Sequence, residues 1–358
     1  MESHNKTFIS IVLPCYNEEV ILRSNLEIIQ KFIESRSAKY DWEIIIINDG
    51  SRDRTGEIAD EIAKLDNHIR VIHHPVNLNL GNAIKTGFCN SKGDVIVVLD
   101  VDLSYSAEYI EKLVDKLIVE NADIVIASPY MKGGKVKAVP FFRKIMSKWV
   151  NKFMRFASQE KYHTFTGMVR AYRTSFIRTV NLKTRDYEIN PEIIYKSMIL
   201  RARIIEIPAD LDWTEQNKHA GKRTSSIRVL RGFFSGLMSA FIFRPYIFFM
   251  AIGSLLMCLS LYQLVWLLID TMTLWHQLII QGIQTDYPFS NSLAIQFKNN
   301  PQSFLVGGIT FIAAIQFLSV GFLSLQSKRY FEELFHFGTE LKKELIIKKE
   351  KYSSNNDR

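Results

Sequence analysis

The sequence is poor in cysteine and lacks the glycine-rich loops that bind nucleotides in many enzymes. Its three cysteines, Cys15, Cys89 and Cys258, are far apart and show no metal-ligand spacing, which argues for a reducing compartment and against a disulfide framework. No Gly-X-Gly-X-X-Gly follows the first expected strand, and the chain has no Gly-X-X-X-X-Gly-Lys-Ser/Thr. The first absence argues against a dinucleotide-binding fold, and the second excludes a phosphate-loop nucleotidase.

The N-terminal residues and the overall charge bear on location and partners. Met1 to Thr7 is polar and lacks the apolar core of a signal peptide, so we expect the N-terminal part to stay in the cytosol. The chain has 358 residues and a formal net charge of +8, and its mean hydropathy is zero. A soluble domain joined to a membrane anchor gives such an average. The positive charge suits anionic partners, namely nucleic acid, anionic lipid or phosphorylated substrates.

Strand-like and helix-like stretches alternate between residues 8 and 210. Short apolar runs predict the strands, and apolar residues at helical spacing predict the helices between them. The expected strands are 8–13, 43–47, 70–73, 95–99 and 124–127, and the expected helices lie near 19–33, 58–65, 82–91 and 108–120. Strands that are apolar along their length indicate a sheet covered by helices on both faces. The expected fold class is therefore α/β with a mainly parallel sheet.

Three polar turns, 14–18, 48–51 and 100–102, each follow one of these expected strands. Ligands of such sheets bind beyond the carboxyl ends of the strands. Because turns are polar in most proteins, a single turn says little about function. Their convergence on one edge of the sheet is the first functional signal in the sequence.

Two long apolar stretches, 248–269 and 304–325, lie in the C-terminal third of the chain. Each is long enough to cross a bilayer, which takes about 20 helical residues, and we prefer this interpretation to a pair of buried core helices. The expected organisation is a soluble domain over 1–226, a juxtamembrane amphipathic helix over 227–243, a transmembrane region over 244–329 with spans near 246–269 and 304–326, an extracytoplasmic loop over 270–303, and a charged cytosolic tail over 330–358.

The charges around the spans predict their orientation. Arg244 precedes the first span, and Lys328 and Arg329 follow the second, whereas Lys298 is the one Lys or Arg between residues 270 and 303. By the positive-inside rule, the loop is extracytoplasmic and the soluble domain and both termini are cytosolic. The expected location is the inner membrane of a bacterium or an archaeon.

Two further segments, 141–157 and 227–243, mix basic and aromatic residues. Such a mixture is typical of an amphipathic helix that lies on anionic lipid. Nucleic acid is the rival partner for a basic and aromatic surface. The adjacent membrane anchor favours lipid, so we expect no nucleic acid.

Asp100 and Asp102 follow a buried strand and are two residues apart. In extended backbone, such residues point to the same side, and two neighbouring carboxylates repel unless a cation lies between them. Mg²⁺ is typically held by one or two carboxylates together with phosphate oxygens. A metal–diphosphate complex is the simplest ligand for this turn, whereas a solvated turn with spare acids is the alternative for an isolated Asp-X-Asp.

Four motifs in sequence order carry a resemblance to a known family. They are the runs 9–19, 46–55, 79–83 with Gly87, and 98–104. These motifs resemble those of family 2 glycosyltransferases of the GT-A fold. The last is similar to the Asp-X-Asp motif of the dolichyl-phosphate mannose synthase and polyprenyl-phosphate glycosyltransferase group. The paired apolar stretches, particularly 311–333 with Gln316 and Gly321, resemble that group as well.

The resemblance implies roles for individual residues on the donor side. The implied nucleotide-binding residues are Pro14, Tyr16, Glu18, Asp49, Ser51, Lys85 and Asp100. Asp100 and Asp102 are the implied ligands of a divalent metal, Mg²⁺ or Mn²⁺, and both count as catalytic. Lys85 is equally explained as a solvated helix lysine. Glu192 matches an acid of the family's helix, whose role is either catalytic or structural.

The acceptor side is matched more loosely. Arg143, Ser147 and Asn151 are spaced by four residues and so share one helix face; the first two resemble the Arg-X-X-X-Ser pattern that meets a lipid phosphate. Snorkelling of Arg143 at the membrane interface is the alternative. Further implied contacts to the acceptor phosphate are Arg170, Lys218 and Arg223, and the chain departs from its relatives at His163 and Met168, where they often carry an acid.

The implied function is an inverting transfer of a sugar from a UDP- or GDP-linked donor to a membrane polyprenyl phosphate. The sequence offers no obvious acid near Gly167 to act as a general base, which favours a phosphate acceptor that is already ionised. Transfer to a hydroxyl of a membrane glycolipid is the runner-up, and a degenerate nucleotide-binding scaffold is the non-enzymatic alternative. A processive polysaccharide synthase would carry Gln-X-X-Arg-Trp, which is absent. The base, the sugar and the lipid length stay open, and self-association is a further partner hypothesis.

Overall fold

The computed structural model describes residues 6–158, 161–215, 241, 244–281 and 288–356. The chain divides into two compact units, one made of residues 1–240 with 332–358 and the other of 241–331. Lys218, Arg223 and most of the expected juxtamembrane helix over 227–243 fall outside the described residues.

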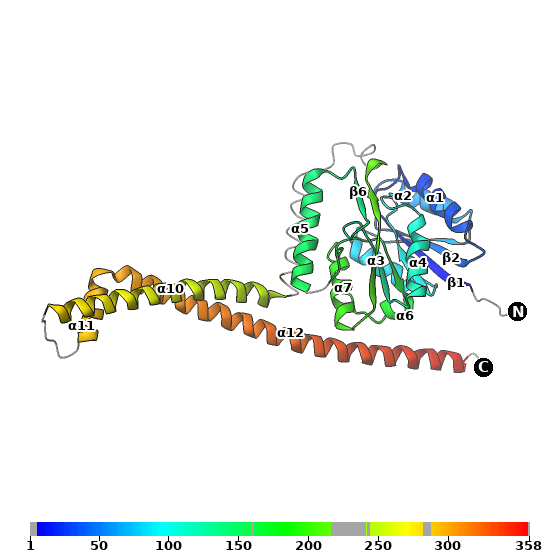
Figure 1. The fold of residues 1–358 in the computed structure, drawn as a ribbon. Helices are drawn as coiled ribbons and strands as arrows, with labels where there is room; N and C mark the ends of the chain where they lie inside the picture. Colours follow the sequence, from blue (N-terminus) through cyan, green and yellow to red (C-terminus); the bar gives the residue numbers. More distant parts are fainter. Residues whose placement is uncertain (1–5, 159–160, 216–240, 242–243, 282–287, 357–358) are drawn as a thin grey trace. The chain divides into compact units, whose positions relative to one another are not determined.

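The first unit is an α/β domain (Figure 1). Its strands are β1 (Thr7–Cys15), β2 (Tyr40–Asn48), β3 (Ile69–His73), β4 (Val95–Val98), β5 (Ile124–Ser128), β6 (Lys135–Lys137), β7 (Arg170–Arg173), β8 (Ile204–Pro208) and β9 (Asp210–Asp212). Its helices are α1 (Leu22–Glu34), α2 (Thr55–Ala63), α3 (Leu80–Asn90), α4 (Glu108–Val119), α5 (Phe141–Ser158), α6 (Thr174–Ile177) and α7 (Ile189–Ile199). Every expected strand and helix of this region is present, with ends shifted by a few residues.

The main sheet has seven strands in the order β3-β2-β1-β4-β7-β5-β8. Its strand pairs are parallel except those of β7, which runs antiparallel to both β4 and β5. A mainly parallel sheet is therefore confirmed. The chain passes from β1 to β2 on one side, whereas β4 pairs with β1 on the other. The order of strands thus changes direction between β1 and β4, and open α/β sheets bind their ligands beyond the carboxyl ends of the strands at such a point.

Both faces of β1 are buried, which explains its mostly apolar sequence. Ile9, Ile11 and Leu13 belong to a core cluster shared with α1 and α4. On the other face, Val12 contacts α3 at Gly87, where an added Cβ would come within 2.3 Å of its side chain. The glycine of this motif thus allows α3 to approach the sheet closely.

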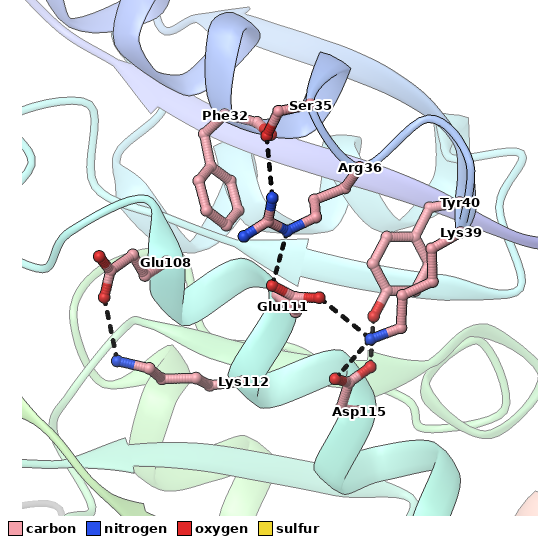
Figure 2. Close-up of polar contacts among 9 residues, drawn as sticks. All are labelled: Phe32, Ser35, Arg36, Lys39, Tyr40, Glu108, Glu111, Lys112 and Asp115. Atoms are coloured by element: carbon pink, nitrogen blue, oxygen red, sulfur yellow. Dashed lines mark hydrogen bonds and ion pairs between the residues drawn. The ribbon is translucent and has the colours of Figure 1, made fainter.

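Helix α4 is fastened to the α1–β2 connection by a network of charged side chains (Figure 2). Glu111 accepts hydrogen bonds from Arg36 at 2.8 Å and from Lys39 at 3.0 Å. Lys39 also reaches Asp115 at 2.6 Å, and Asp115 accepts a hydrogen bond from the Tyr40 hydroxyl. The network therefore fixes α4, the helix that follows the turn at residues 100–102 in sequence, against the α1–β2 connection.

The second unit contains α10 (Pro245–Ile280), α11 (Pro288–Asn299) and the first part of α12 (Pro301–Asn356). In the part of the chain that the structure describes, α10 and α12 are long and apolar enough to cross a membrane. Only 11% of the most apolar stretch of each helix is buried, so their apolar surface requires lipid or another protein to cover it. Gly253 lies against Leu318 and Gly321 against Met250, the close packing that small residues allow between membrane helices.

The segment expected as an extracytoplasmic loop, 270–303, is largely helical where the structure describes it. Helix α10 continues to Ile280, and α11 occupies residues 288–299. Helix α10 extends past residue 269, where the expected span ends. Hydropathy therefore marks the limit of the apolar segment rather than the end of the helix. The charged tail is also helical, because α12 runs on to Asn356.

Candidate functional site

The three polar turns meet at the carboxyl ends of β1, β2 and β4, as the sequence predicts. The backbone N–H of Asp49 donates to Cys15 at 2.9 Å, and that of Leu99 donates to Val12 at 3.1 Å. These bonds hold the ends of β2 and β4 beside the end of β1. The residues expected to bind the donor therefore come together on one edge of the sheet.

The first two turns are tied together by reciprocal hydrogen bonds. The Asn17 N–H donates to the Ser51 hydroxyl at 3.1 Å, and the Asn17 side chain accepts from Arg52 N–H at 2.8 Å. The Glu18 N–H donates to the Thr55 hydroxyl at 2.7 Å. Asn17 has a φ of 59°, a left-handed conformation that asparagine tolerates better than most residues. Ser51 thus holds the first turn against the second, and the neighbouring side chain of Tyr16 is exposed.

Asp49 is held by a histidine that the sequence interpretation missed. Its Oδ1 accepts from Leu78 N–H at 2.9 Å and lies 2.7 Å from His74 Nδ1. Both side chains are buried, and the other ring nitrogen of His74 lies 2.9 Å from the Thr86 hydroxyl. A histidine just after a strand, next to a known motif, was the available signal.

The Asp100–Asp102 turn brings acidic side chains close together. Burial raises the pKa of Asp100 well above its usual value, and the charges of Asp102 and Glu18 raise it further. Burial also raises the pKa of Glu18 to about 7, again helped by Asp102 and by Asp53. A divalent cation would relieve this repulsion, so the residues fit the expected metal.

The cation would need further ligands from its substrate. Among the residues that the structure describes, no three His, Cys, Asp or Glu side chains form a ready metal site. Mg²⁺ commonly binds through one or two carboxylates and completes its shell with phosphate oxygens and water. The turn itself is strained, since Leu103 has a φ of 52°, and such strain in a non-glycine residue often marks a functional site.

Arg143 lies on the first part of α5. Burial lowers the pKa of its guanidinium, whereas the charges of Tyr187, Tyr130 and Asp102 act to raise it. One helical turn further on, the Ser147 hydroxyl accepts a hydrogen bond from the Tyr130 hydroxyl at 2.8 Å. Asn151 is buried and holds the following loop, accepting from Phe165 N–H at 2.7 Å. The helix that these three residues were expected to share is therefore present.

Arg170 does not lie at the expected acceptor site. Its side chain is wholly buried, and its guanidinium donates to the carbonyls of Asn190 at 3.0 Å and Phe165 at 2.7 Å. The expected contact with an acceptor phosphate is thus contradicted, because β7 directs this side chain into the core. The enclosed charge instead fastens the 165–168 loop to α7.

Glu192 and Lys85 lie on helices α7 and α3 and are not part of the three turns. The Glu192 carboxylate is buried and accepts from Lys196 at 2.5 Å, from Lys183 N–H at 3.0 Å and from the Thr184 hydroxyl at 2.6 Å. Its charge also acts on Lys85, whose pKa is lowered chiefly by burial. These contacts favour the structural alternative for Glu192. His163 likewise supports a loop, with its ring 2.9 Å from Glu206.

Comparison with known proteins finds a match in the N-terminal half of the chain. The family model described as Glycosyl transferase family 2 matches residues 10–180. This match spans the three polar turns and α5, and so covers most of the candidate site.

Two proteins of similar sequence come from Pyrococcus furiosus and Mycolicibacterium smegmatis. The chain is 34% identical over 203 residues to a dolichol-phosphate mannosyltransferase of Pyrococcus furiosus. This alignment covers 56% of this chain and 55% of that protein. It is 29% identical over 223 residues to a polyprenol monophosphomannose synthase of Mycolicibacterium smegmatis, covering 60% of this chain and 81% of that one. The chain thus matches little more than half the length of the Pyrococcus protein.

A solved structure shares a distant likeness over most of the chain. It is a mannosyltransferase from Pyrobaculum calidifontis in complex with GDP-Man and Mn²⁺, with 14% identity, a TM-score of 0.44, and coverage of 95% of this chain and 88% of that one.

Proposed function

We propose that this protein transfers a sugar, with inversion, from a nucleotide-diphosphate sugar to the phosphate of a membrane polyprenyl phosphate. The observation that carries the proposal is that Arg143, which the charge of Asp102 reaches, lies on a helix with an exposed aromatic surface. A cationic side chain beside a metal turn, on a lipid-binding helix, suits an acceptor that is both anionic and membrane-bound. Two relatives are named for such acceptors, dolichol phosphate and polyprenol monophosphate.

The donor half of the proposal rests on the three turns. Asp49, with Pro14 and Tyr16 nearby, would contact the base and ribose, and Asp100 and Asp102 would hold Mg²⁺ or Mn²⁺ with the donor diphosphate. The cation, when bound, would neutralise the charge that develops on the departing nucleoside diphosphate. A UDP- or GDP-linked donor is consistent with this pocket, whose surroundings leave the base open.

The acceptor half concerns what Arg143 does. A phosphate monoester has a second pKa of about 6 and is largely ionised at neutral pH, so its oxygen can attack the anomeric carbon without a general base. Arg143 would bind that phosphate through in-plane N–H groups and orient the attacking oxygen. The back-side attack inverts the anomeric centre while the sugar bond to the diphosphate breaks.

The membrane part of the proposal rests on α5 and on the two long apolar helices. Phe141, Phe142, Trp149 and Phe156 are 62–78% exposed on α5, interleaved with Lys144, Lys148 and Lys152. Such a surface favours insertion at the level of lipid head groups. We infer that α10 and α12 anchor the chain, with the α/β domain and both termini in the cytosol. The exposed apolar faces of these helices also suit self-association, which size measurement in detergent would test.

The deciding experiment offers the wild-type chain, in proteoliposomes with Mg²⁺, a panel of labelled UDP and GDP sugars. One arm contains polyprenyl phosphate and the other a neutral glycolipid. Labelled product is expected on the phosphate lipid alone, and both Asp102→Asn and Arg143→Ala should reduce it at least 100-fold. Product on the glycolipid alone would support the hydroxyl acceptor instead, and metal-dependent binding without turnover would support the scaffold alternative.

A further inference from the structure

An aromatic ring that no motif predicts lies against the acceptor arginine. The guanidinium carbon of Arg143 is 4.1 Å from the centroid of the Trp213 ring. Trp213 is half-buried and directly follows β9. At this separation the cation is attracted to the face of the ring, and tryptophan gives the strongest such contact among aromatic residues.

Trp213 is placed by backbone hydrogen bonds. Strand β9 pairs with β6, and the Trp213 N–H donates to the Lys137 carbonyl at 3.2 Å. Just beyond the ring, the Thr214 N–H donates to the Asp212 carboxylate at 2.9 Å. The tryptophan is therefore carried on a short, paired strand with a closed turn after it.

The same strand is joined to the metal turn. The Asp212 N–H donates to the Ser104 carbonyl at 2.9 Å, and the Ser104 N–H donates to the Asp102 carboxylate at 2.8 Å. A continuous series of contacts thus runs from Asp102 through Ser104 and Asp212 to Trp213. It ends on the guanidinium of Arg143, on which the charge of Asp102 also acts.

Stacking leaves the useful part of the guanidinium available. The central carbon of the Arg143 guanidinium lies over the ring, whereas the N–H donors of a guanidinium lie at its periphery and point outward. A long arginine side chain has much rotational freedom, and fixing it before substrate arrives lowers the entropic cost of binding. The Tyr130–Ser147 hydrogen bond holds the same helix one turn away.

We propose that Trp213 is a positioning residue that holds Arg143 at a set distance from the metal turn and aims its donors at the acceptor phosphate. This inference rests on the proposed function and adds to it a residue outside the family motifs. It also gives β9 a role, because this strand joins the Asp102–Ser104 turn to Trp213 and so to Arg143.

The contact predicts a selective defect. Cation–π contacts of this kind correspond to roughly 2- to 30-fold in affinity. Trp213→Ala should raise the KM for polyprenyl phosphate by about tenfold within that range, with the KM for the nucleotide sugar changed less than twofold. Trp213→Phe keeps an aromatic face and should restore most of the acceptor affinity.

The test is a double-mutant cycle in the full-length chain in detergent micelles, using a short polyprenyl phosphate as acceptor. Trp213→Ala, Arg143→Ala and the double variant are compared by their kinetic constants, and thermal unfolding with and without nucleotide shows whether each variant is folded. If Trp213 acts through Arg143, the tryptophan substitution adds nothing in the Arg143→Ala background. Phe337→Ala removes an aromatic side chain that is 61% exposed on α12, and serves as the control for a general effect of aromatic loss.

Two failures can be told apart. A wild-type enzyme that leaves polyprenyl phosphate unmodified overturns the proposed function, and this inference with it. A wild-type enzyme that glycosylates the lipid, with additive losses in the cycle or with equal changes in donor and acceptor KM, overturns the role of Trp213 alone. If Trp213→Ala does not fold, Trp213→Leu takes its place in the cycle, because leucine fills much of the space without an aromatic face.

Discussion

His74 and Asp49 form a buried pair in which Nδ1 of the ring lies 2.7 Å from Oδ1 of the carboxylate. The Leu78 N–H donates to the same oxygen. Because these contacts converge on Oδ1, they fix the direction of the other carboxylate oxygen before any nucleotide arrives. A base or ribose contact made by Asp49 would thus depend on a histidine that does not touch the ligand.

His74→Ala is expected to weaken nucleotide-sugar binding by about five- to tenfold, the cost of losing one hydrogen bond that orients a charged group. Calorimetry with the donor and Mg²⁺ would measure it. His68→Ala changes an exposed histidine at the opposite end of β3, and its donor affinity should match the wild type. Equal affinities for all three proteins would show that Asp49 needs no such support.

Asp102→Asn should have opposite effects on the metal-free and the metal-bound protein. Removing one of the repelling charges beside Asp100 relieves the free protein, so its unfolding temperature should rise by a few degrees. Mg²⁺ with nucleoside diphosphate should then add little, whereas the same mixture stabilises the wild type. Scanning fluorimetry with and without ligand gives all four values. A variant that is destabilised when free and still stabilised by Mg²⁺ with the nucleotide would contradict the metal assignment.

Much of the donor site can be predicted from sequence because its residues belong to local turns that follow recognisable strands. Asp100, Asp102 and Asp49 are placed by the order of strands alone. Contacts between distant segments are different. The Trp213–Arg143 contact depends on β9 pairing with β6, and three-residue strands have no distinct hydrophobic pattern.

Arg170 shows a second limit of prediction from sequence. Its segment resembles a motif of the family, yet β7 is buried on both faces and holds the guanidinium in the core, where backbone carbonyls accept hydrogen bonds from it. Sequence indicates a positive charge, which usually means an exposed residue. The direction of the side chain is settled by the antiparallel pairing of β7 with β4 and β5.

Glu192→Gln tests whether this acid is structural or catalytic. The carboxylate is paired with buried Lys196 and accepts bonds from the 183–184 segment, so losing its charge should destabilise the fold by about 3 kcal/mol. The kcat of the folded variant, measured well below its unfolding temperature, should stay within about threefold of the wild type. A 100-fold loss of kcat at unchanged unfolding temperature would make Glu192 catalytic after all.

Glu43 gives the domain a predictable response to acid. Glu43 lies in β2 and its carboxylate is buried, and burial acts to raise its pKa. Hydrogen bonds from the Ser10 hydroxyl at 2.6 Å, the Lys92 N–H at 2.6 Å and the Arg70 guanidinium at 2.6 Å outweigh that effect and lower the pKa. The folded state therefore favours the ionised form. Its stabilisation is present above the usual glutamate pKa of about 4.3, and is lost as the pH falls through the lower, folded value.

Glu43→Gln should accordingly lower the free energy of unfolding by about 2 kcal/mol at pH 7, since hydrogen bonds to a charged group are lost. The difference from the wild type should shrink as the pH falls below about 4.3, because the wild-type carboxylate then becomes protonated. Unfolding temperatures in detergent between pH 7 and pH 3.5 would follow this convergence. Glu61→Gln removes an exposed partner of Arg23 and should leave the curve unchanged. Curves for Glu43→Gln and the wild type that stay parallel throughout would mean that the pKa of Glu43 is the same in the folded and unfolded chains.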